Sequence, residues 1–317
     1  MDVDPRLLRY FLAVAEELHF GRAAARLYIS QPSLSNQIHK LEDTLGTPLF
    51  LRTSRQVQLT AAGRTLLDEA PAALAALERA AEHTRLAGAG IATTLRLGYT
   101  PVASFDTLPA LLATAEQDHP ELTVVPRELF SAAIPERLLA GDLDIGLALH
   151  PQPIGGVSSE PLRREPVAAL LSKRHRLADA QSISLGELRE ETLLLFPRQL
   201  SPAYYDHIVA ACERAGFQPR IQAFQDPPVN AMLARLPGGR EVGLIPASFA
   251  FHAAEAEPGI VAREIVDPAI LAELSILWSA RAPSAAIARF LDSARSCATG
   301  NGWLHAPNGD PAPTLPR

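Results

Sequence analysis

The amino-acid sequence predicts an α/β protein with a small helical N-terminal domain, a linker helix and a C-terminal body of two lobes. Apolar residues recur at helical spacing near the N-terminus, an alanine- and leucine-rich run follows, and short apolar segments alternate with helical ones from Leu95 onward. A chain of 317 residues is too long for one ordinary core and suits two or three domains. The expected divisions are a domain at residues 1–60, a linker at 61–90, a two-lobed domain at 91–300 and a disordered, Pro- and Gly-rich tail at 301–317.

The composition excludes a membrane protein and a disulfide scaffold. Hydrophobic residues make up 47% and charged residues 20%, and no apolar run approaches the length needed to span a bilayer. Charged residues among the first nine positions occupy the place of a signal peptide's apolar core, so a cytoplasmic protein is expected. Cys212 and Cys297 lie far apart without metal-ligand spacing. No cofactor or metal is therefore expected, and both thiols are expected to be buried and inert.

The charge is unevenly distributed along the chain. The net charge is −6, yet the segment from Phe20 to Arg64 holds six bases and two acids, a net charge of +4. Over residues 1–90 ten bases balance ten acids, so the whole negative excess lies in residues 91–317. A locally basic segment on an acidic body indicates that this segment contacts phosphates and that the body has another task.

Three helices are expected before Gly46, which supplies a left-handed stop. One buried stripe marks the first helix: Leu7, Leu8, Phe11, Val14, Ala15 and Leu18. The second runs from about Gly21 to Leu27, where three small alanines let another helix cross closely. Ser30 is a good N-cap for the third helix, and Pro32 is tolerated in its first turn.

The exposed face predicted for the third helix is polar. It carries Gln31, Ser33, Ser35, Asn36, His39 and Lys40. A helix that reads DNA bases uses short hydroxyls and amides near its N-terminus. Taken alone, this face fits a solvated surface with a helix cap better than a DNA-reading face. Arg52 and Arg55 favour the DNA-binding interpretation, because they lie between two apolar pairs where a β-wing can reach phosphates or the minor groove.

This segment resembles the winged helix-turn-helix domain of LysR-type transcriptional regulators over nearly sixty contiguous positions. The matching positions include Phe11, Ala15-Glu16, Phe20, Arg22-Ala23-Ala24, Ser30-Gln31-Pro32, Leu34-Ser35, Leu41-Glu42, Leu45-Gly46, Leu49-Phe50, Leu59-Thr60 and Ala62-Gly63. The resemblance implies a regulator that binds an operator in double-stranded DNA, with Arg55 in the minor groove. It also implies that Gln31, Pro32, Ser35 and Asn36 face the major groove. Together with the polar face and the basic residues, the predicted DNA-binding residues are Arg22, Gln31, Pro32, Ser33, Ser35, Asn36, Lys40, Arg52 and Arg55.

Two departures from the family pattern lie in this segment. Asn36 stands where the family often has Arg, so the base preference at that position should differ. His19 replaces a commoner Ser at the expected cap of the second helix. This replacement is expected to loosen the cap.

The run from Ala61 to about Leu86 predicts a long helix. Its apolar positions follow spacings of three, four and seven, which suits pairing with another helix. In the family this helix is the dimer interface, which here implies Leu67, Leu74, Leu77 and Ala81 and a homodimer or homotetramer. A plain connecting helix without a partner is the alternative. Pro71 predicts a kink near Asp68–Ala70 or a short break.

The body alternates strands and helices, which predicts parallel sheets with helices on their faces. The expected strands are 95–99, 122–129, 143–149, 167–171, 193–196, 220–224, 242–245, 261–266 and 274–280. The expected helices begin at Thr107 or cover 132–140, 203–215, 229–236 and 285–297. Such a run is long enough for two lobes with a ligand cleft at the strand ends.

By resemblance, the body is a two-lobed effector domain like a periplasmic binding protein, similar to the subgroup that responds to muconate, benzoate and chlorinated-catechol products. Carried over by position, the effector-binding residues are Thr100, Pro101, Val102, Ser104, Ser131, Leu149, His150, Phe196, Pro202 and Ala203. Val102 and Leu149 stand where the subgroup has Ser and Arg. An aromatic or single-carboxylate effector is therefore expected, with His150 either a substitute partner for the anion or a structural residue.

The sequence shows no catalytic constellation. Asp142 and Asp144 flank a strand start and are expected only to solvate it. The expected function is therefore ligand-responsive transcriptional regulation without enzymatic activity, with RNA polymerase as a candidate partner and no membrane association. Two alternatives stay open: an architectural DNA binder that ignores small molecules, and a ligand-transforming enzyme with a DNA-binding head.

Overall fold

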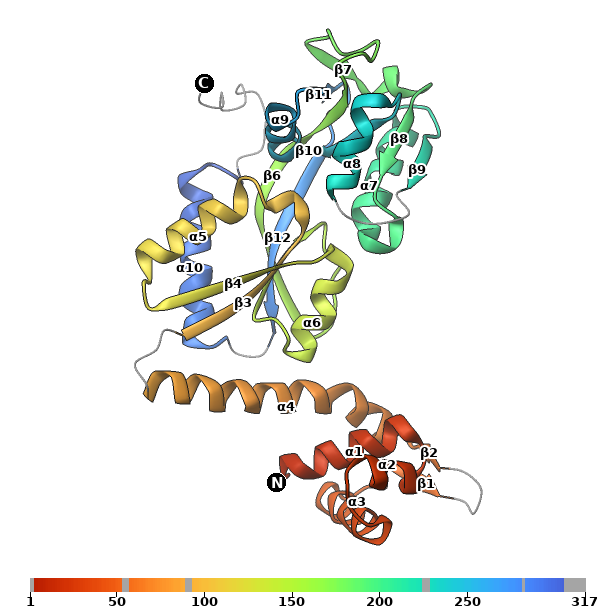
Figure 1. The fold of residues 1–317 in the computed structure, drawn as a ribbon, viewed down its shortest axis with the longest axis vertical. Helices are drawn as coiled ribbons and strands as arrows, with labels where there is room; N and C mark the ends of the chain where they lie inside the picture. Colours follow the sequence, from red (N-terminus) through yellow and green to blue (C-terminus); the bar gives the residue numbers. More distant parts are fainter. Residues whose placement is uncertain (1–2, 53–56, 89–92, 224–228, 281–282, 305–317) are drawn as a thin grey trace. The chain divides into compact units, whose positions relative to one another are not determined.

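The computed structural model describes residues 3–52, 57–88, 93–223, 229–280 and 283–304. The chain divides into two compact units, Met1–Arg85 and Leu86–Arg317, which Figure 1 shows as a mainly helical unit and a larger α/β unit. The first unit contains α1 (Pro5–Glu17), α2 (Phe20–Arg26), α3 (Gln31–Leu45), β1 (Phe50–Arg52), β2 (Val57–Leu59) and most of α4 (Ala61–Gly88). The three predicted helices, the wing hairpin and the linker helix are all present.

Local sequence determines where the helices of the first unit begin and end. The Ser30 hydroxyl accepts a hydrogen bond from the Ser33 N–H at 3.3 Å, and Gly46 ends α3 at φ 69°. The His19 ring caps α2, because its Nδ1 accepts from the Gly21 and Arg22 N–H groups at 3.1 and 3.2 Å. The expectation that His19 loosens this cap is therefore wrong: an imidazole acceptor replaces the serine hydroxyl and serves two of the helix's unpaired donors.

An aromatic cluster holds the hairpin against the helices. The Phe50 ring lies 5.4 Å from Phe11 and 5.8 Å from Phe20, measured between ring centroids. Behind it, α4 passes so close to the chain at Leu49 that a Cβ at Gly63 would lie 2.2 Å from the Leu49 carbonyl oxygen. Only glycine allows this approach. The wing, α1 and the start of α4 therefore share one core.

The linker helix α4 is continuous from Ala61 to Gly88 with Pro71 inside it, so the predicted break is wrong. Ala70 and Leu74, on either side of the proline, are 1% and 9% exposed and belong to the core of the first unit. Their burial offsets the hydrogen bond that the proline removes. Pro71 itself is exposed, where its ring meets solvent.

The second unit is built on one mixed sheet in the order β4-β3-β5-β12-β6-β10-β8-β9, with β11 beside β6 and β7 beside β11. The strands are β3 (Thr93–Tyr99), β4 (Leu122–Glu128), β5 (Ile145–Leu149), β6 (Val157–Ser172), β7 (Ser182–Ser184), β8 (Thr192–Leu195), β9 (Arg220–Ala223), β10 (Val242–Pro246), β11 (Ile260–Val266) and β12 (Leu271–Ser279). The helices are α5 (Thr107–Asp118), α6 (Ile134–Ala140), α7 (Pro202–Arg214), α8 (Val229–Arg235), α9 (Ala247–Ala256) and α10 (Ala285–Gly300), and short 3₁₀ turns are η1 (Pro101–Ala103), η2 (Ser131–Ala133), η3 (Leu185–Leu188), η4 (Arg198–Leu200) and η5 (Leu236–Gly238).

The strands form the two predicted lobes. Lobe 1 contains β3, β4, β5, β12 and helices α5, α6 and α10; lobe 2 contains β7 to β11 and helices α7, α8 and α9 (Figure 1). The strand β6 belongs to both, because residues 157–166 pair with β12 and residues 167–172 pair with β10 and β11. The two halves of the sheet are thus joined through a single continuous strand.

The prediction of purely parallel sheets is wrong for the joining strands. The strands β6 and β12 run antiparallel to their neighbours, whereas β3 with β4 and β8 with β9 are parallel. The sequence also did not predict β7, α9 or the first ten residues of β6. That part of β6 contains Pro161 and Pro166, which argue against a strand. A register shift at Leu274/Ser275 in β12 accommodates the irregular pairing there.

Two further expectations need correction. Asp144 is 6% exposed, and its carboxylate accepts from the Arg96 backbone N–H at 2.8 Å and from the Arg96 guanidinium at 3.1 Å twice, so it does not simply solvate the strand. The tail is ordered through Leu304: the Trp303 ring is 8% exposed, lies 5.2 Å from the Arg163 guanidinium, and the Trp303 carbonyl accepts from the Arg164 N–H. The rest of the predicted tail lies outside the described residues.

Both cysteines are buried with free thiols, and burial raises the pKa of Cys212 to about 11. This agrees with the expected inert thiols. Across the described residues, no helix combines the length and apolar character that crossing a bilayer requires.

Candidate functional site

The recognition helix α3 presents the predicted polar face to solvent. Its opposite face is fully buried, since Leu34, Ile38 and Leu41 are all 0% exposed. Its exposed side chains include Gln31, Pro32, Ser33, Asn36, His39 and Lys40, with Ser35 half-buried. An amide and hydroxyl face on a rigidly packed helix has the chemistry that base reading in a major groove requires.

The arginines of α2 are already engaged with acids of α1. The Arg22 Nε lies 3.1 Å from Glu17 Oε2, and the Arg26 guanidinium pairs with Glu16. Both arginines are exposed, so these pairs are weak and phosphates can compete for them. The net charge of +4 counted over residues 20–64 therefore overstates the positive charge around α2. Glu16 and Glu17, which pair with these arginines, lie just outside the counted segment.

Glu42, which the sequence analysis did not name as a site residue, holds the wing in position. Glu42 Oε1 accepts from the Leu49 and Phe50 N–H groups at 2.8 and 3.2 Å, and its side chain is 11% exposed. This contact fixes the start of β1 against α3. Of the two predicted wing residues, Arg55 lies outside the described residues, and the side chain of Arg52 does as well.

We predict that Glu42→Ala weakens operator binding and lowers the thermal stability of the first unit. Its loss would leave two backbone N–H groups without this acceptor, at a cost of about 1–3 kcal/mol each if they stay unpaired. Glu42→Gln retains an amide oxygen and should preserve most of both properties. Fluorescence anisotropy with operator DNA and thermal denaturation give the two readouts; equal behaviour of the two variants would contradict an anchoring role.

A cavity of about 170 Å³ lies between the two lobes of the second unit. Five of the predicted effector-binding residues line it, namely Ser131, Leu149, His150, Pro202 and Ala203. The first three come from lobe 1 and the last two from the start of α7 in lobe 2. The structure thus brings together side chains that are up to 72 positions apart in the chain.

The other predicted effector-binding residues are not among those that line this cavity. Thr100, Pro101, Val102 and Ser104 form the turn after β3, where the Thr100 N–H donates to the Leu147 carbonyl and the Ser104 hydroxyl donates to the Pro101 carbonyl. Phe196 lines a smaller adjoining cavity of about 10 Å³, and its ring packs at 5.4 Å against Phe130 of lobe 1. Phe196 therefore closes the space between the lobes.

The sequence analysis missed Ser201, which lines both cavities. It stands at the N-cap position of α7 and is 8% exposed. Among the described residues its buried hydroxyl has no hydrogen-bond partner. Across the cavity, the Ser131 hydroxyl accepts from the Leu149 N–H at 3.0 Å and keeps its own proton to donate. The Ser-Pro pair at a helix start was the sequence feature that could have identified Ser201.

His150 is held neutral beside this cavity. Its Nε2 accepts from the Glu273 N–H at 3.1 Å, and its ring stacks on His207 at 4.4 Å. Burial, with the nearby His207, lowers the pKa of His150 to about 4, although Glu273 opposes the shift. A neutral acceptor cannot neutralise a bound carboxylate, so the geometry favours the structural role of His150.

We predict that the second unit loses stability as the pH falls from 6.5 toward 4. The folded state keeps His150 neutral while an unfolded histidine takes up a proton in this window, so this group leaves stability unchanged above the window and opposes folding within it. The free energy of unfolding should fall by up to about 1.4 kcal/mol per pH unit from this group. Burial also lowers the pKa of His207, which contributes in the same direction.

Denaturant titrations at several pH values measure this slope. His150→Gln, which retains an acceptor at the position of Nε2, should flatten it. His252→Gln removes an exposed histidine and serves as the control. A slope that His150→Gln leaves unchanged would show that other groups cause the pH dependence.

A packed recognition helix with a wing and a two-lobed domain with a cavity between its lobes define a DNA-binding regulator with an effector-binding domain. The family comparisons agree over both parts. Residues 5–64 match the bacterial regulatory helix-turn-helix proteins of the LysR family, and residues 88–298 match the LysR substrate binding domain. The chain belongs to the LysR family of transcriptional regulators.

The similarity extends over nearly the whole chain. The transcriptional regulator TfdS of Cupriavidus pinatubonensis (strain JMP 134 / LMG 1197) is 36% identical over 293 residues, which cover 92% of this chain and 97% of TfdS. The crystal structure of CbnR, a LysR family transcriptional regulator, is 28% identical with a TM-score of 0.64 and covers 93% of this chain and 99% of that one. The crystal structure of full-length CbnR in complex with its target DNA also matches, with a TM-score of 0.57. The match covers 93% of this chain and 100% of the CbnR chain.

Proposed function

We propose that this chain regulates transcription in the cytoplasm in response to a compact organic effector with one carboxylate or none, bound between the lobes. The observation that carries this proposal is the unpartnered Ser201 hydroxyl inside a mostly apolar cavity. Leu149, Pro202 and Ala203 give the cavity apolar walls that suit an aromatic ring or a short aliphatic chain. None of the described lining residues is a lysine or arginine.

One carboxylate can be bound without a cation. The first N–H groups of α7, a helix of 13 residues, lack helical partners and favour a negative charge. Ser201 and Ser131 add hydroxyl donors from the two lobes. A second carboxylate would face the neutral His150 and apolar walls, and burying it there would be costly. The cost of burying a second carboxylate therefore disfavours dicarboxylate effectors.

Effector binding alters DNA binding by changing how the lobes close. A ligand that contacts Ser131 and Ser201 at once favours the arrangement in which both can reach it. We infer that the change passes to the operator through a homodimer or homotetramer, with residues 1–60 as the DNA-binding part and RNA polymerase as a candidate partner. Asn36, Arg52 and Arg55 remain proposed DNA contacts, together with the other exposed residues of α3.

Two other functions make different predictions. An architectural DNA binder would give the same footprint with and without any metabolite. A ligand-transforming enzyme would turn over the bound molecule. The LysR-family membership and the relatives named as transcriptional regulators support regulation without catalysis, which product analysis after incubation with candidate effectors would test.

We predict that calorimetry on the full chain detects benzoate binding and finds cis,cis-muconate weaker, because the second carboxylate lacks a cation. Ser201→Ala and Ser131→Val should each weaken benzoate by about tenfold, since each removes a buried hydrogen bond to a charged group. Ser104→Ala is the control, because its hydroxyl bonds to Pro101 and does not line the cavity. Tight muconate binding that ignores both serines would contradict the proposed cavity.

Fewer side chains of α4 are exposed for the proposed dimer interface than the spacing in the sequence suggested. Leu74 is 9% exposed and packs in the core of its own protomer with Leu67, whereas Leu77 is 49% exposed and Ala81 is exposed. Leu74 is therefore not available to a partner helix within this unit, and Leu67, which is half-buried, is available only in part. Leu77 and Ala81 remain the proposed contact.

We predict that Leu77→Glu shifts the protein toward monomers and lowers operator affinity, because a dimer holds two half-sites together. Sedimentation velocity measures the first effect and an electrophoretic mobility assay the second. Leu304→Glu, at a leucine that is 42% exposed in the second unit, introduces the same charge and should leave the assembly unchanged. Oligomers that persist in Leu77→Glu would exclude this face of α4.

A further inference from the structure

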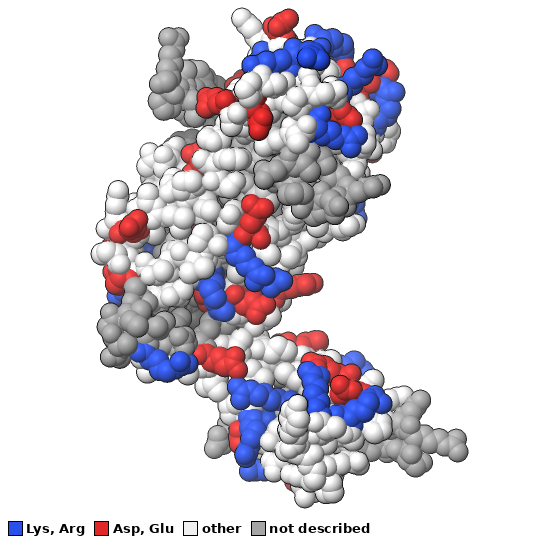
Figure 2. All heavy atoms as spheres, viewed as in Figure 1, with Lys and Arg blue, Asp and Glu red and all other residues white. Residues whose placement is uncertain are grey.

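A second cleft, unlike the cavity between the lobes, lies within lobe 2. Its volume is about 380 Å³, and it opens between the turn that follows β6 at residues 173–176 and the loop at residues 237–240 after α8. It shares no lining residue with the cavity between the lobes. Figure 2 shows Lys and Arg side chains gathered at the end of the second unit that carries β7 and β11. This concentration contrasts with the acidic balance of residues 91–317.

Three arginines line the cleft: Arg174, Arg176 and Arg240. Arg176 is held in place, because its Nε donates to Glu191 Oε1 at 2.7 Å and its Nη2 donates to the Glu187 carbonyl at 2.6 Å. Within the described part of the chain, the guanidinium groups of Arg174 and Arg240 make no hydrogen bond or ion pair, and both residues are exposed. Two arginines are thus available beside a third that is fixed.

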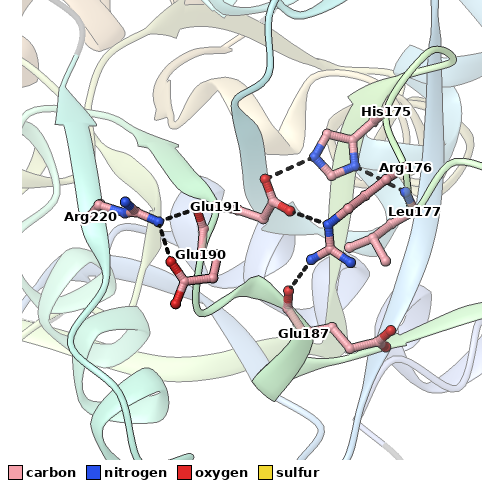
Figure 3. A network of polar contacts seen from close by, with 7 residues as sticks. All are labelled: His175, Arg176, Leu177, Glu187, Glu190, Glu191 and Arg220. Carbon is pink, nitrogen blue, oxygen red and sulfur yellow. Dashed lines mark hydrogen bonds and ion pairs between the residues drawn. The ribbon is translucent and has the colours of Figure 1, made fainter.

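Glu191, the acid among the described residues that line this cleft, already has partners for its carboxylate. Figure 3 shows the Glu191 carboxylate between His175 and Arg176, with Oε2 at 3.2 Å from His175 Nε2. The His175 Nδ1 accepts from the Leu177 N–H at 3.2 Å, so Nε2 carries the ring proton and donates it to Glu191. With both carboxylate oxygens engaged, Glu191 orients Arg176 and leaves the cleft a positive balance.

The two walls of the cleft are tied together. The Ser172 hydroxyl, in a residue 2% exposed, donates to the Pro237 carbonyl at 3.0 Å and accepts from the Arg174 N–H at 3.2 Å. Behind this bond, a Cβ at Gly259 would lie 2.8 Å from Pro237 Cβ, so the loop is packed closely. A Cβ at Gly238 would meet nothing within 4 Å, which leaves the cleft side open. The shape of the cleft is therefore set before any ligand arrives.

We propose that this cleft binds a small phosphate-bearing anion, such as a phosphate ester or a diphosphate, as a second input separate from the effector between the lobes. Guanidinium groups match phosphate oxygens in a bidentate way, and three of them around one site suit more than one negative charge. A cleft of about 380 Å³ falls in the range of small-molecule sites. A concave site of this size suits a compact anion better than the long convex backbone of duplex DNA.

The test is calorimetric titration of the full chain with inorganic pyrophosphate in ~0.15 M salt, where weak surface attraction is largely screened. Arg240→Glu and Arg174→Glu should each weaken binding by at least about tenfold, since each loses a charged hydrogen bond and adds repulsion. Arg127→Glu, an exposed arginine on β4, changes the net charge equally and should stay within about twofold. Arg240→Lys keeps the charge and should lose less than Arg240→Glu.

Benzoate binding provides the internal reference, because it reports the cavity between the lobes and should be unchanged in the two glutamate variants. The proposal is overturned if pyrophosphate does not bind, or if Arg127→Glu weakens binding as much as Arg240→Glu. It is also overturned if Arg240→Glu and Arg174→Glu reduce operator affinity while pyrophosphate binding is unchanged, which would identify the patch as a DNA contact.

Discussion

The two lobes of the second unit depend on one strand and one buried ion pair. The strand β6 pairs with lobe 1 in its first half and with lobe 2 in its second. Near the crossing, Arg163 Nε lies 3.1 Å from Glu165 Oε1, and these side chains are 11% and 13% exposed. Arg163 also donates to Asp106 at the start of α5, while Glu165 accepts from the Ser248 N–H and hydroxyl at the start of α9.

Burial raises the pKa of Glu165 against the opposing effect of Arg163. Removing Arg163 would leave the Glu165 carboxylate without a cation, whereas Arg163 without Glu165 would still pair with Asp106. The pair thus holds a helix of each lobe to the same strand.

This arrangement explains why the space between the lobes is suited to an effector. The lobes are joined through β6 and the connection from β11 to β12, and the buried apolar residues of both lobes form one connected cluster. The contacts that bridge them include ring packing, of Phe130 on Phe196 and of His150 on His207, and a hydrogen bond between the His207 ring and the Leu271 carbonyl. A bound molecule adds contacts between the same two surfaces. Its differential affinity for the closed arrangement then sets how far the equilibrium moves.

The sequence predicted those parts of the structure that local chemistry determines. Ser30 and Gly46 mark the start and the end of α3, because capping needs only a few neighbouring residues. The apolar alternation located nearly every strand. The prediction from sequence failed where residues far away in the chain determine the local structure. No strand was predicted at residues 157–166 of β6, a stretch that contains Pro161 and Pro166, and it is a strand through its pairing with β12. Leu74 fitted a dimer face by spacing, yet the fold buries it against α1 and its neighbours. Periodicity reports that a side chain is buried, and it does not report which surface buries it.

Ser201 shows how the same limit applies to the site. Its neighbours Pro202 and Ala203 could be carried over by position, but the unmet hydrogen bond of Ser201 becomes visible only when its burial and surroundings are known. A buried hydroxyl without a partner costs about 1–3 kcal/mol relative to one that is satisfied. An effector of the proposed kind, which accepts from this hydroxyl, would recover that free energy in the bound state. In the proposed function, a carboxylate therefore lies at the end of the cavity that holds Ser201 and the start of α7, and the apolar part of the effector packs on Leu149, Pro202 and Ala203.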